Sequence, residues 1–147
     1  MRRQLTTNRR LVFGTFVAAI LALAVGASQG LAGARGNGSA KAPIQYHGGS
    51  CGVDTGSKSV GTASFTLKGS TLTIRVKLHG ADPGTYRLFV DTGACEFIGS
   101  FSLFKVDASG DGEKSVSIDV SGFGRSFFVN AFNNTNGHAN DSLIVNL

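Results

Sequence analysis

One short segment carries oxygen-bearing side chains at the spacing that a calcium ion uses. Asp107, Ser109 and Asp111 stand at alternate positions, and Gly112 follows them. This is the arrangement of the first ligands in a calcium-binding loop. The twelfth position of such a loop is a bidentate Glu, but here it is Ile118, and Asp, Ser and Gly are also ordinary residues of a tight β-turn. The segment is therefore either a plain turn or a calcium site, and calcium is the only cofactor that the sequence suggests.

The other groups capable of metal or catalytic chemistry are scattered along the chain. His47, His79 and His138 are far apart and form no H-x-H or H-x-x-x-H pair, whereas zinc and copper sites need three or four converging ligands. The G-x-S-x-G spacing occurs at Ser28, within residues 1–34, and at Ser50. This motif marks a nucleophile only on a strained turn between a strand and a helix, and no segment after residue 34 has helical periodicity. The sequence thus predicts no catalytic residue and no zinc or copper site.

Residues 133–141 (NNTNGHAND) form a polar segment that is long for a hairpin loop. Its amide groups are suited to bind sugar hydroxyls or an ion. Asn and Gly are also common turn residues, so a solvated turn is the alternative interpretation.

Three phenylalanines fall on the sides of their strands that are expected to face water. Successive residues of a strand point to opposite faces, which places Phe89 opposite Leu88, Phe104 opposite its neighbours and Phe128 opposite Phe127. Twist, a bulge or a covering loop can turn such residues inward. Otherwise Phe89, Phe104 and Phe128 form an apolar patch that receives a ligand, a partner or a second copy of the chain.

The elements that must position these groups are β-strands, because apolar residues recur at every second position from residue 60 onward. A strand is expected over 71–79, joined to another over 63–67 by a short turn at 68–70. Further strands are expected over 86–90, 97–106, 115–121, 126–132 and 142–147, and residues 44–47 are a candidate for one more. Seven or eight short strands with glycine-rich turns predict an all-β fold, an antiparallel immunoglobulin-like or Greek-key sandwich.

Residues 1–34 have the pattern of a cleavable bacterial secretion signal. Residues 1–10 contain four arginines and no acidic residue, and an apolar stretch over 11–25 follows them. Small residues are frequent from there up to Ala34. The stretch is shorter than the roughly 20 residues that span a bilayer, which favours a cleaved signal. The alternative is an uncleaved anchor, and this would be the only contact of the protein with a membrane. The segment 8–13 (NRRLVF) resembles a twin-arginine signal, which exports folded proteins, although an ordinary export signal also fits.

Removal of this signal changes the charge of the protein. The whole chain has a net charge of +5, but four of its fourteen basic residues precede Ala34. The part after Ala34 keeps ten basic residues and all nine acidic ones, so its net charge is +1. It has no cluster of basic residues, which argues against nucleic acid as a partner. We expect a glycine-rich, flexible lead-in over 35–43 and one sandwich domain over 44–147, located outside the cell or in its envelope.

Two cysteines remain in the exported part, Cys51 and Cys95. A small, even number of cysteines in an exported protein predicts a disulfide. Two free buried thiols are the alternative.

The segment 78–95 (LHGADPGTYRLFVDTGAC) resembles the copper–zinc superoxide dismutase type of sandwich. In that family a P-G turn leads into a strand and then into a glycine–cysteine loop, and the turn over 107–112 has a counterpart there too. The family's strand after the P-G turn carries two copper-binding histidines. The matching positions here are Leu88 and Val90, which cannot bind metal, so the resemblance implies the architecture and argues against the activity.

Together these patterns predict an exported, non-catalytic binding or cell-envelope-associated module. Its expected partner is a protein or carbohydrate ligand, or a second copy in a homo-oligomer. Two alternatives stay open. One is a metal-dependent or loop-site enzyme on a superoxide dismutase-like sandwich, and the other is a calcium-stabilised structural module.

Overall fold

The computed structural model describes residues 36–46 and 50–147, so the predicted signal over 1–34 and His47 lie outside the described residues. The described residues form ten strands and one short 3-10 turn, η1 (Ser50–Gly52). The strands are β1 (Gly36–Gln45), β2 (Ser59–Gly69), β3 (Thr71–Leu78), β4 (Gly84–Thr92), β5 (Phe97–Ser100), β6 (Phe104–Val106), β7 (Gly112–Asp119), β8 (Ser126–Asn133), β9 (Ala139–Ser142) and β10 (Val145–Asn146). Within these ranges no helix is long and apolar enough to cross a membrane.

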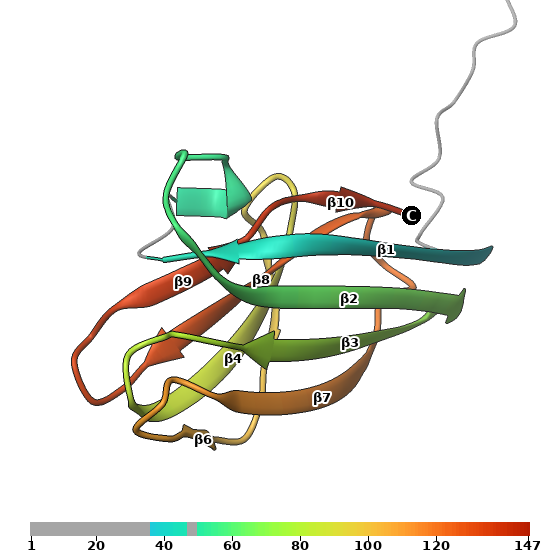
Figure 1. The fold of residues 1–147 in the computed structure, drawn as a ribbon. Coiled ribbons are helices and arrows are strands. Elements are labelled where there is room, and N and C mark those ends of the chain that lie inside the picture. Colours follow the sequence, from blue (N-terminus) through green and yellow to red (C-terminus); the bar gives the residue numbers. More distant parts are fainter. Residues whose placement is uncertain (1–35, 47–49) are drawn as a thin grey trace, which may run out of the picture.

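All strand pairs are antiparallel, and the strands form one sheet that folds into two layers (Figure 1). The strand order is β5-β4-β8-β9-β1-β2-β3-β7, with β10 paired to β8 and β6 paired to β4. We call β1, β2, β3 and β7 the front layer, and β4, β5, β8 and β9 the back layer. The layers are joined where β9 pairs with β1, and β6 lies beside β7 on the other side, so the sheet nearly closes. The predicted all-β antiparallel sandwich is confirmed.

The front layer forms as its alternating sequence predicts. Leu72, Ile74 and Val76 on β3 are fully buried, whereas the residues between them face solvent. Phe65 of β2 stands opposite Ile74 in the antiparallel register. Gly69 closes the β2–β3 hairpin with a φ of 61°, a conformation that glycine adopts without steric cost. The predicted hairpin is therefore confirmed.

The core between the layers is mainly apolar, and among its few polar groups, which include the buried amides of Asn133 and Asn140, is the phenol of Tyr86. This side chain is fully buried, and its hydroxyl donates a hydrogen bond to the main-chain oxygen of Asp82 at 2.8 Å. A buried phenol needs such an acceptor. A tyrosine bonded to the main chain a few residues upstream is also a recurring feature of Greek-key sandwiches. The contact ties the start of β4 to the turn that precedes it.

The prediction of a flexible lead-in over 35–43 is wrong for residues 36–43, which belong to β1. This strand runs along the whole of β2, from the pair Gly36–Gly69 to the pair Gln45–Ser59. The segment 36–43 is rich in glycine and small polar residues, as linkers are. Such residues bury little apolar area, so the sequence pattern of a strand is weak here. Main-chain hydrogen bonds to β2 do not depend on side chains, and the burial of Ile44 adds to them.

Two of the predicted strands are interrupted. The prediction over 97–106 is split into β5 and β6, because Ser100 pairs with Phe89 whereas Phe104 pairs with Tyr86. The segment from Ser100 to Phe104 is therefore one residue longer than the segment of β4 that it pairs with. The extra residue cannot join the hydrogen-bond ladder, as in a β-bulge.

The segment over 142–147 is split in the same way. Asp141 pairs with Asn130 and Val145 pairs with Phe127, so one extra residue again separates β9 from β10. The expected burial of the chain's last strand is nevertheless seen at Val145, which is 6% exposed.

Candidate functional site

The three phenylalanines predicted to form a patch do not lie together at the surface. Phe104 is only 9% exposed and packs on Tyr86, with 5.8 Å between ring centroids. Phe128 is 4% exposed and lies under Gly52, where an added Cβ would be 2.9 Å from the Phe128 ring. The predicted patch is therefore wrong for these two residues, because a shift in register turns one inward and a loop covers the other. Phe89 alone stays on the outer face.

Phe89 instead belongs to a different group of aromatic residues, which we call the aromatic cluster: Phe89, Phe97 and Phe132. The ring of Phe89 lies 6.4 Å from that of Phe97 and 6.4 Å from that of Phe132, centroid to centroid. Phe97 is 59% exposed. These residues come from β4, β5 and β8, so only the pairing of three strands brings them together. The available sequence signal was the alternation that puts Phe132 on the outer side of β8.

Polar residues continue the same outer face next to the aromatic cluster. Asn130 of β8 stands opposite Phe89 on one side and opposite Asp141 of β9 on the other. Asp91 lies two residues beyond Phe89, on the same side of β4. Asp141 is only 4% exposed, so a carboxylate that the sequence places in a polar loop is covered in the folded protein.

Both carboxyl groups are unfavourably placed for ionisation. Burial raises the pKa of Asp91 above its ordinary value. Burial, followed by the negative charge of Asp91, raises the pKa of Asp141 to about 6. Moving a charged group out of water favours its neutral form, so this pair lacks the compensation that buried carboxylates usually have.

Two oxygen atoms at this place have no hydrogen-bond partner among the described residues: Oδ1 of Asn130 and Oδ1 of Asp141. We call them the acceptor pair. Leaving a buried polar atom unpaired costs about 1–3 kcal/mol, and native proteins keep few such atoms. The acceptor pair is therefore the clearest departure from ordinary polar pairing in the described part of the chain.

A loop that follows η1 closes over this end of the back layer. The predicted disulfide is confirmed: Cys51 is bonded to Cys95, with 5.3 Å between their Cα atoms, and so ties the loop to the turn after β4. The Gln45 side chain, opposite Asp141, accepts hydrogen bonds from the main-chain N–H and the hydroxyl of Thr55, both at 3.1 Å. The loop is thus fixed by one covalent bond and by side-chain contacts from β1.

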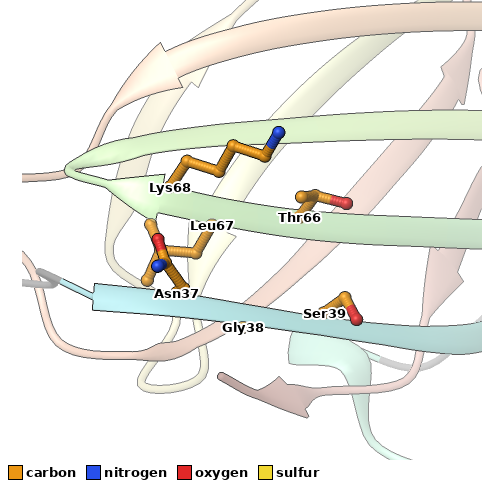
Figure 2. Close-up of a pocket in the computed structure, with 6 residues that line it drawn as sticks. All are labelled: Asn37, Gly38, Ser39, Thr66, Leu67 and Lys68. Atoms are coloured by element: carbon orange, nitrogen blue, oxygen red, sulfur yellow. The ribbon is translucent and has the colours of Figure 1, made fainter.

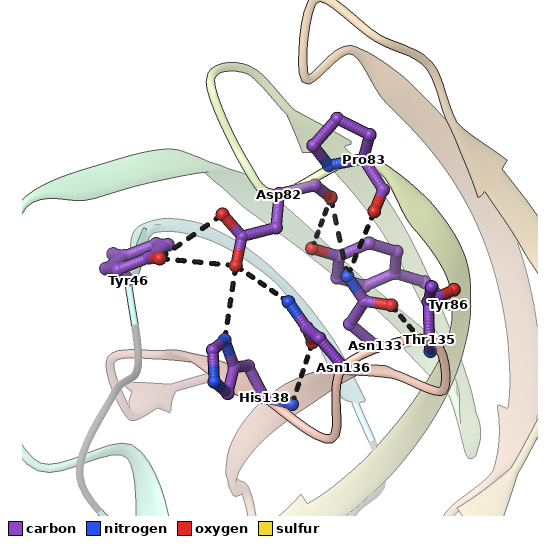
Figure 3. Close-up of polar contacts among 8 residues, drawn as sticks. All are labelled: Tyr46, Asp82, Pro83, Tyr86, Asn133, Thr135, Asn136 and His138. Carbon is purple, nitrogen blue, oxygen red and sulfur yellow. Dashed lines mark hydrogen bonds and ion pairs between the residues drawn. The ribbon is translucent and has the colours of Figure 1, made fainter.

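A second polar group centres on Asp82, at the turn before β4 (Figure 3). Its carboxylate accepts hydrogen bonds from the Tyr46 hydroxyl at 3.2 Å and from Asn136 Nδ2 at 2.8 Å, and Nδ1 of His138 lies 3.2 Å away. The bond with His138 is the main reason why the pKa of Asp82 lies below its ordinary value. Several partners converge on one acceptor, so this network fastens the 133–138 turn to the turn at 81–83.

The amides of the 133–141 segment serve the protein itself. Asn133 is fully buried, and its Nδ2 points toward the main-chain oxygens of Asp82 and Pro83 (Figure 3). Residues from Ala139 onward belong to β9. The expected loop is therefore shorter than its polar sequence suggests.

The calcium-like segment between β6 and β7 has the hydrogen bonds of a turn. Oδ1 of Asp107 accepts hydrogen bonds from the main-chain N–H groups of Ser109 at 2.9 Å and Asp111 at 3.0 Å, and from the Ser109 hydroxyl at 2.6 Å. The carboxylate of Asp111 contacts His79. Turn chemistry thus accounts for Asp107, Ser109 and Asp111, as one of the two interpretations predicts.

The positions that correspond to copper ligands lie inside the sandwich. Leu88 and Val90 are fully buried in the core. His79 and His138 contact different carboxylates, Asp111 and Asp82. In the described ranges no three His, Cys, Asp or Glu side chains gather in one place. Calcium also binds amide and main-chain oxygens.

A surface depression on the front layer is open to solvent. Figure 2 shows its lining residues on the neighbouring strands β1 and β2. Its volume is about 490 Å³. Lys68 is the only ionisable residue that lines it; the others are Asn37, Gly38, Ser39, Thr66 and Leu67.

Comparison with protein-family models, with curated proteins and with solved structures found no match to this chain. The outer face of the back layer, where the aromatic cluster lies beside buried carboxyl groups, is the candidate binding surface.

Proposed function

We propose that this chain is an exported, non-catalytic binding module and that its ligand rests on the aromatic cluster. The signal pattern over 1–34 supports export, and the Cys51–Cys95 disulfide is consistent with an oxidising environment. The single observation that carries the binding function is Phe97, a phenylalanine that is 59% exposed while its ring contacts a second aromatic residue on paired strands.

The shape of the face favours an extended ligand. The two hollows described on the surface lie on β1 and β2 of the front layer, and none of their lining residues belongs to the aromatic cluster. We therefore do not expect the ligand to occupy an enclosed pocket of the kind that small-molecule sites use. Phe89, Phe97 and Phe132 are held on three hydrogen-bonded strands, so little side-chain freedom is lost when a ligand covers them.

We further propose that the ligand is a glycan of the cell envelope. A sugar ring presents a face of C–H groups, which packs against an aromatic ring, and hydroxyl groups around its edge. The aromatic cluster supplies the first contact, and Arg87 and Asp91 on the same side of β4 supply polar partners at its border. Flat sheet faces of this kind suit a polymer because successive sugar units can lie along them.

The test is co-sedimentation of the mature protein with purified peptidoglycan sacculi, using Phe97→Ser as the variant and Leu103→Ser as the matched control. Leu103 is 46% exposed but lies outside the aromatic cluster. We expect the wild type and Leu103→Ser to sediment with the sacculi, and Phe97→Ser to bind at least about tenfold more weakly, as for the loss of a central aromatic contact.

Equal sedimentation of wild type and Phe97→Ser, or no sedimentation of either, would overturn the glycan proposal. Velocity sedimentation of the same samples identifies the main competitor. A dimer that dissociates in Phe97→Ser would assign the aromatic cluster to a second copy of the chain instead.

A further inference from the structure

The acceptor pair has a geometry that the main-chain ladder imposes. Asn130 and Asp141 stand directly opposite each other on β8 and β9, and opposite residues of an antiparallel pair have Cβ atoms about 4.5–5.5 Å apart. Their Oδ1 atoms are both buried and both without a donor among the described residues. A single cation placed between the two side chains would satisfy both oxygen atoms.

Among the described residues, the surroundings of the acceptor pair add negative charge, and none donates a hydrogen bond to its two oxygen atoms. Asp141 is almost completely buried, with 4% of its surface exposed. Asp91 lies on the same outer face and is close enough for its charge to act on Asp141. On the far side, the Gln45 side-chain oxygen is already occupied by two hydrogen bonds from Thr55.

We propose that a calcium ion binds between Asn130 and Asp141, with Asp91 as the second negative charge of the site. Carboxylate and amide oxygens are the ligands of hard cations, and calcium accepts them in irregular geometry with water completing its shell. The absence of sulfur or imidazole ligands disfavours zinc and copper. Weak sites of this class are typical of extracellular modules, whose calcium dissociation constants are about 10⁻⁴–10⁻³ M.

The proposed site is separate from the calcium-like turn at 107–111. It adjoins the aromatic cluster and shares Asp91 with the polar border proposed there, but its test by calcium titration needs no glycan. Its role is structural. Calcium would hold β9 to β8 at the point where the disulfide-linked loop closes over them, and so keep Phe89, which stands opposite Asn130, in a fixed position.

The experiment is thermal unfolding of the mature protein at neutral pH, in EDTA and in about 5 mM calcium or magnesium. We expect calcium to raise the wild-type Tm by roughly 5–10 °C, because a ligand that binds only the folded state stabilises it by mass action. Magnesium should raise it less, because this ion keeps its own water shell. Asp141→Asn should abolish the calcium response, whereas the control Asp107→Asn should keep it.

Asn130→Ala provides a second test that does not rely on the stability of Asp141→Asn. Calorimetric titration with calcium chloride should show roughly tenfold or greater loss of affinity, because one of the few protein ligands is removed. The proposal is overturned if calcium leaves the wild-type Tm unchanged, or if Asn130→Ala binds calcium as the wild type does. It is also overturned if Asp107→Asn is the variant that loses the response, which would assign calcium to the 107–111 turn.

Discussion

The outer faces of the two layers are built from the same alternation of residues but end in different surface chemistry. On the front layer, Thr66 pairs with Thr73, and Thr73 pairs with Ser117; the last two hydroxyl groups are hydrogen-bonded at 2.9 Å. On the back layer, the corresponding positions carry the aromatic cluster and the acceptor pair. One face is therefore matched to water, and the other combines exposed apolar area with unpaired buried oxygens.

This difference shows where the protein departs from what stability alone requires. The charged residues of the front face are exposed: Arg75 and Glu113 form an ion pair whose side chains are 55% and 44% exposed. Exposed ion pairs of this kind contribute about 0–1 kcal/mol to the free energy of unfolding, so the charges of the front face add little to the stability of the fold. Sites at which local rules are broken are the ones expected to carry function, and these lie on the back face.

The largest effect should come from cutting the covalent link of the back face. Replacing both Cys51 and Cys95 by serine should lower the free energy of unfolding by about 4 kcal/mol, because the bridge spans a separation of 44 residues and restricts the unfolded chain. Urea denaturation of the oxidised wild type and the double variant measures this loss. A change below about 1 kcal/mol would mean that the loop contributes little to the back face.

A smaller effect should come from the glycine that lets the loop cover Phe128. Gly52 and Gly56 both have positive φ, 64° and 69°, but only Gly52 has atoms near an added Cβ. Gly56→Ala should therefore cost about 1 kcal/mol from backbone strain, and Gly52→Ala about 2–3 kcal/mol, because the side chain also meets Phe128 and the Ser142 oxygen. Equal losses in urea denaturation would show that the loop yields without disturbing the back layer.

The acid sensitivity of the protein should depend in part on the Asp82 network, at the end of the sandwich between the two layers. The pKa of folded Asp82 lies below the 3.8 of the free side chain, so its carboxylate stabilises the fold above that pH. This stability is lost as the pH falls through the folded pKa. Asp82→Asn should be less stable than the wild type at neutral pH and should lose less stability below pH 3.8. Parallel acid-unfolding curves for the two proteins would contradict this role.

The smallest effect should come from the front face. Thr73→Val removes a half-exposed hydroxyl and its bond to Ser117, and it should change the free energy of unfolding by less than about 0.5 kcal/mol. Its binding to peptidoglycan sacculi should equal that of the wild type. A loss of binding in Thr73→Val, with Phe97→Ser unaffected, would reverse the functional assignment of the two faces.

Much of the fold follows from local patterns in the sequence. Alternation predicts the β2–β3 hairpin and the inward direction of Leu72, Leu88 and Val90. Cysteine number and the export pattern predict the Cys51–Cys95 bridge. The least accurate expectations concern segments with little apolar content or an extra residue: β1, read as a linker, and the strands over 97–106 and 142–147, each divided by one residue that the ladder cannot accommodate.

The sequence by itself determined most of the inward-facing residues, because side chains alternate along any extended chain. At Phe104 a shift in register reversed the expected face. Only the tertiary structure decided which outward residues meet. Phe97 reaches Phe89 because β5 pairs with β4, and Asp141 reaches Asn130 because β9 pairs with β8. Strand order and register depend on long-range pairing, and a shift of one residue moves a side chain to the other face, so alternation alone could not identify the aromatic cluster or the acceptor pair.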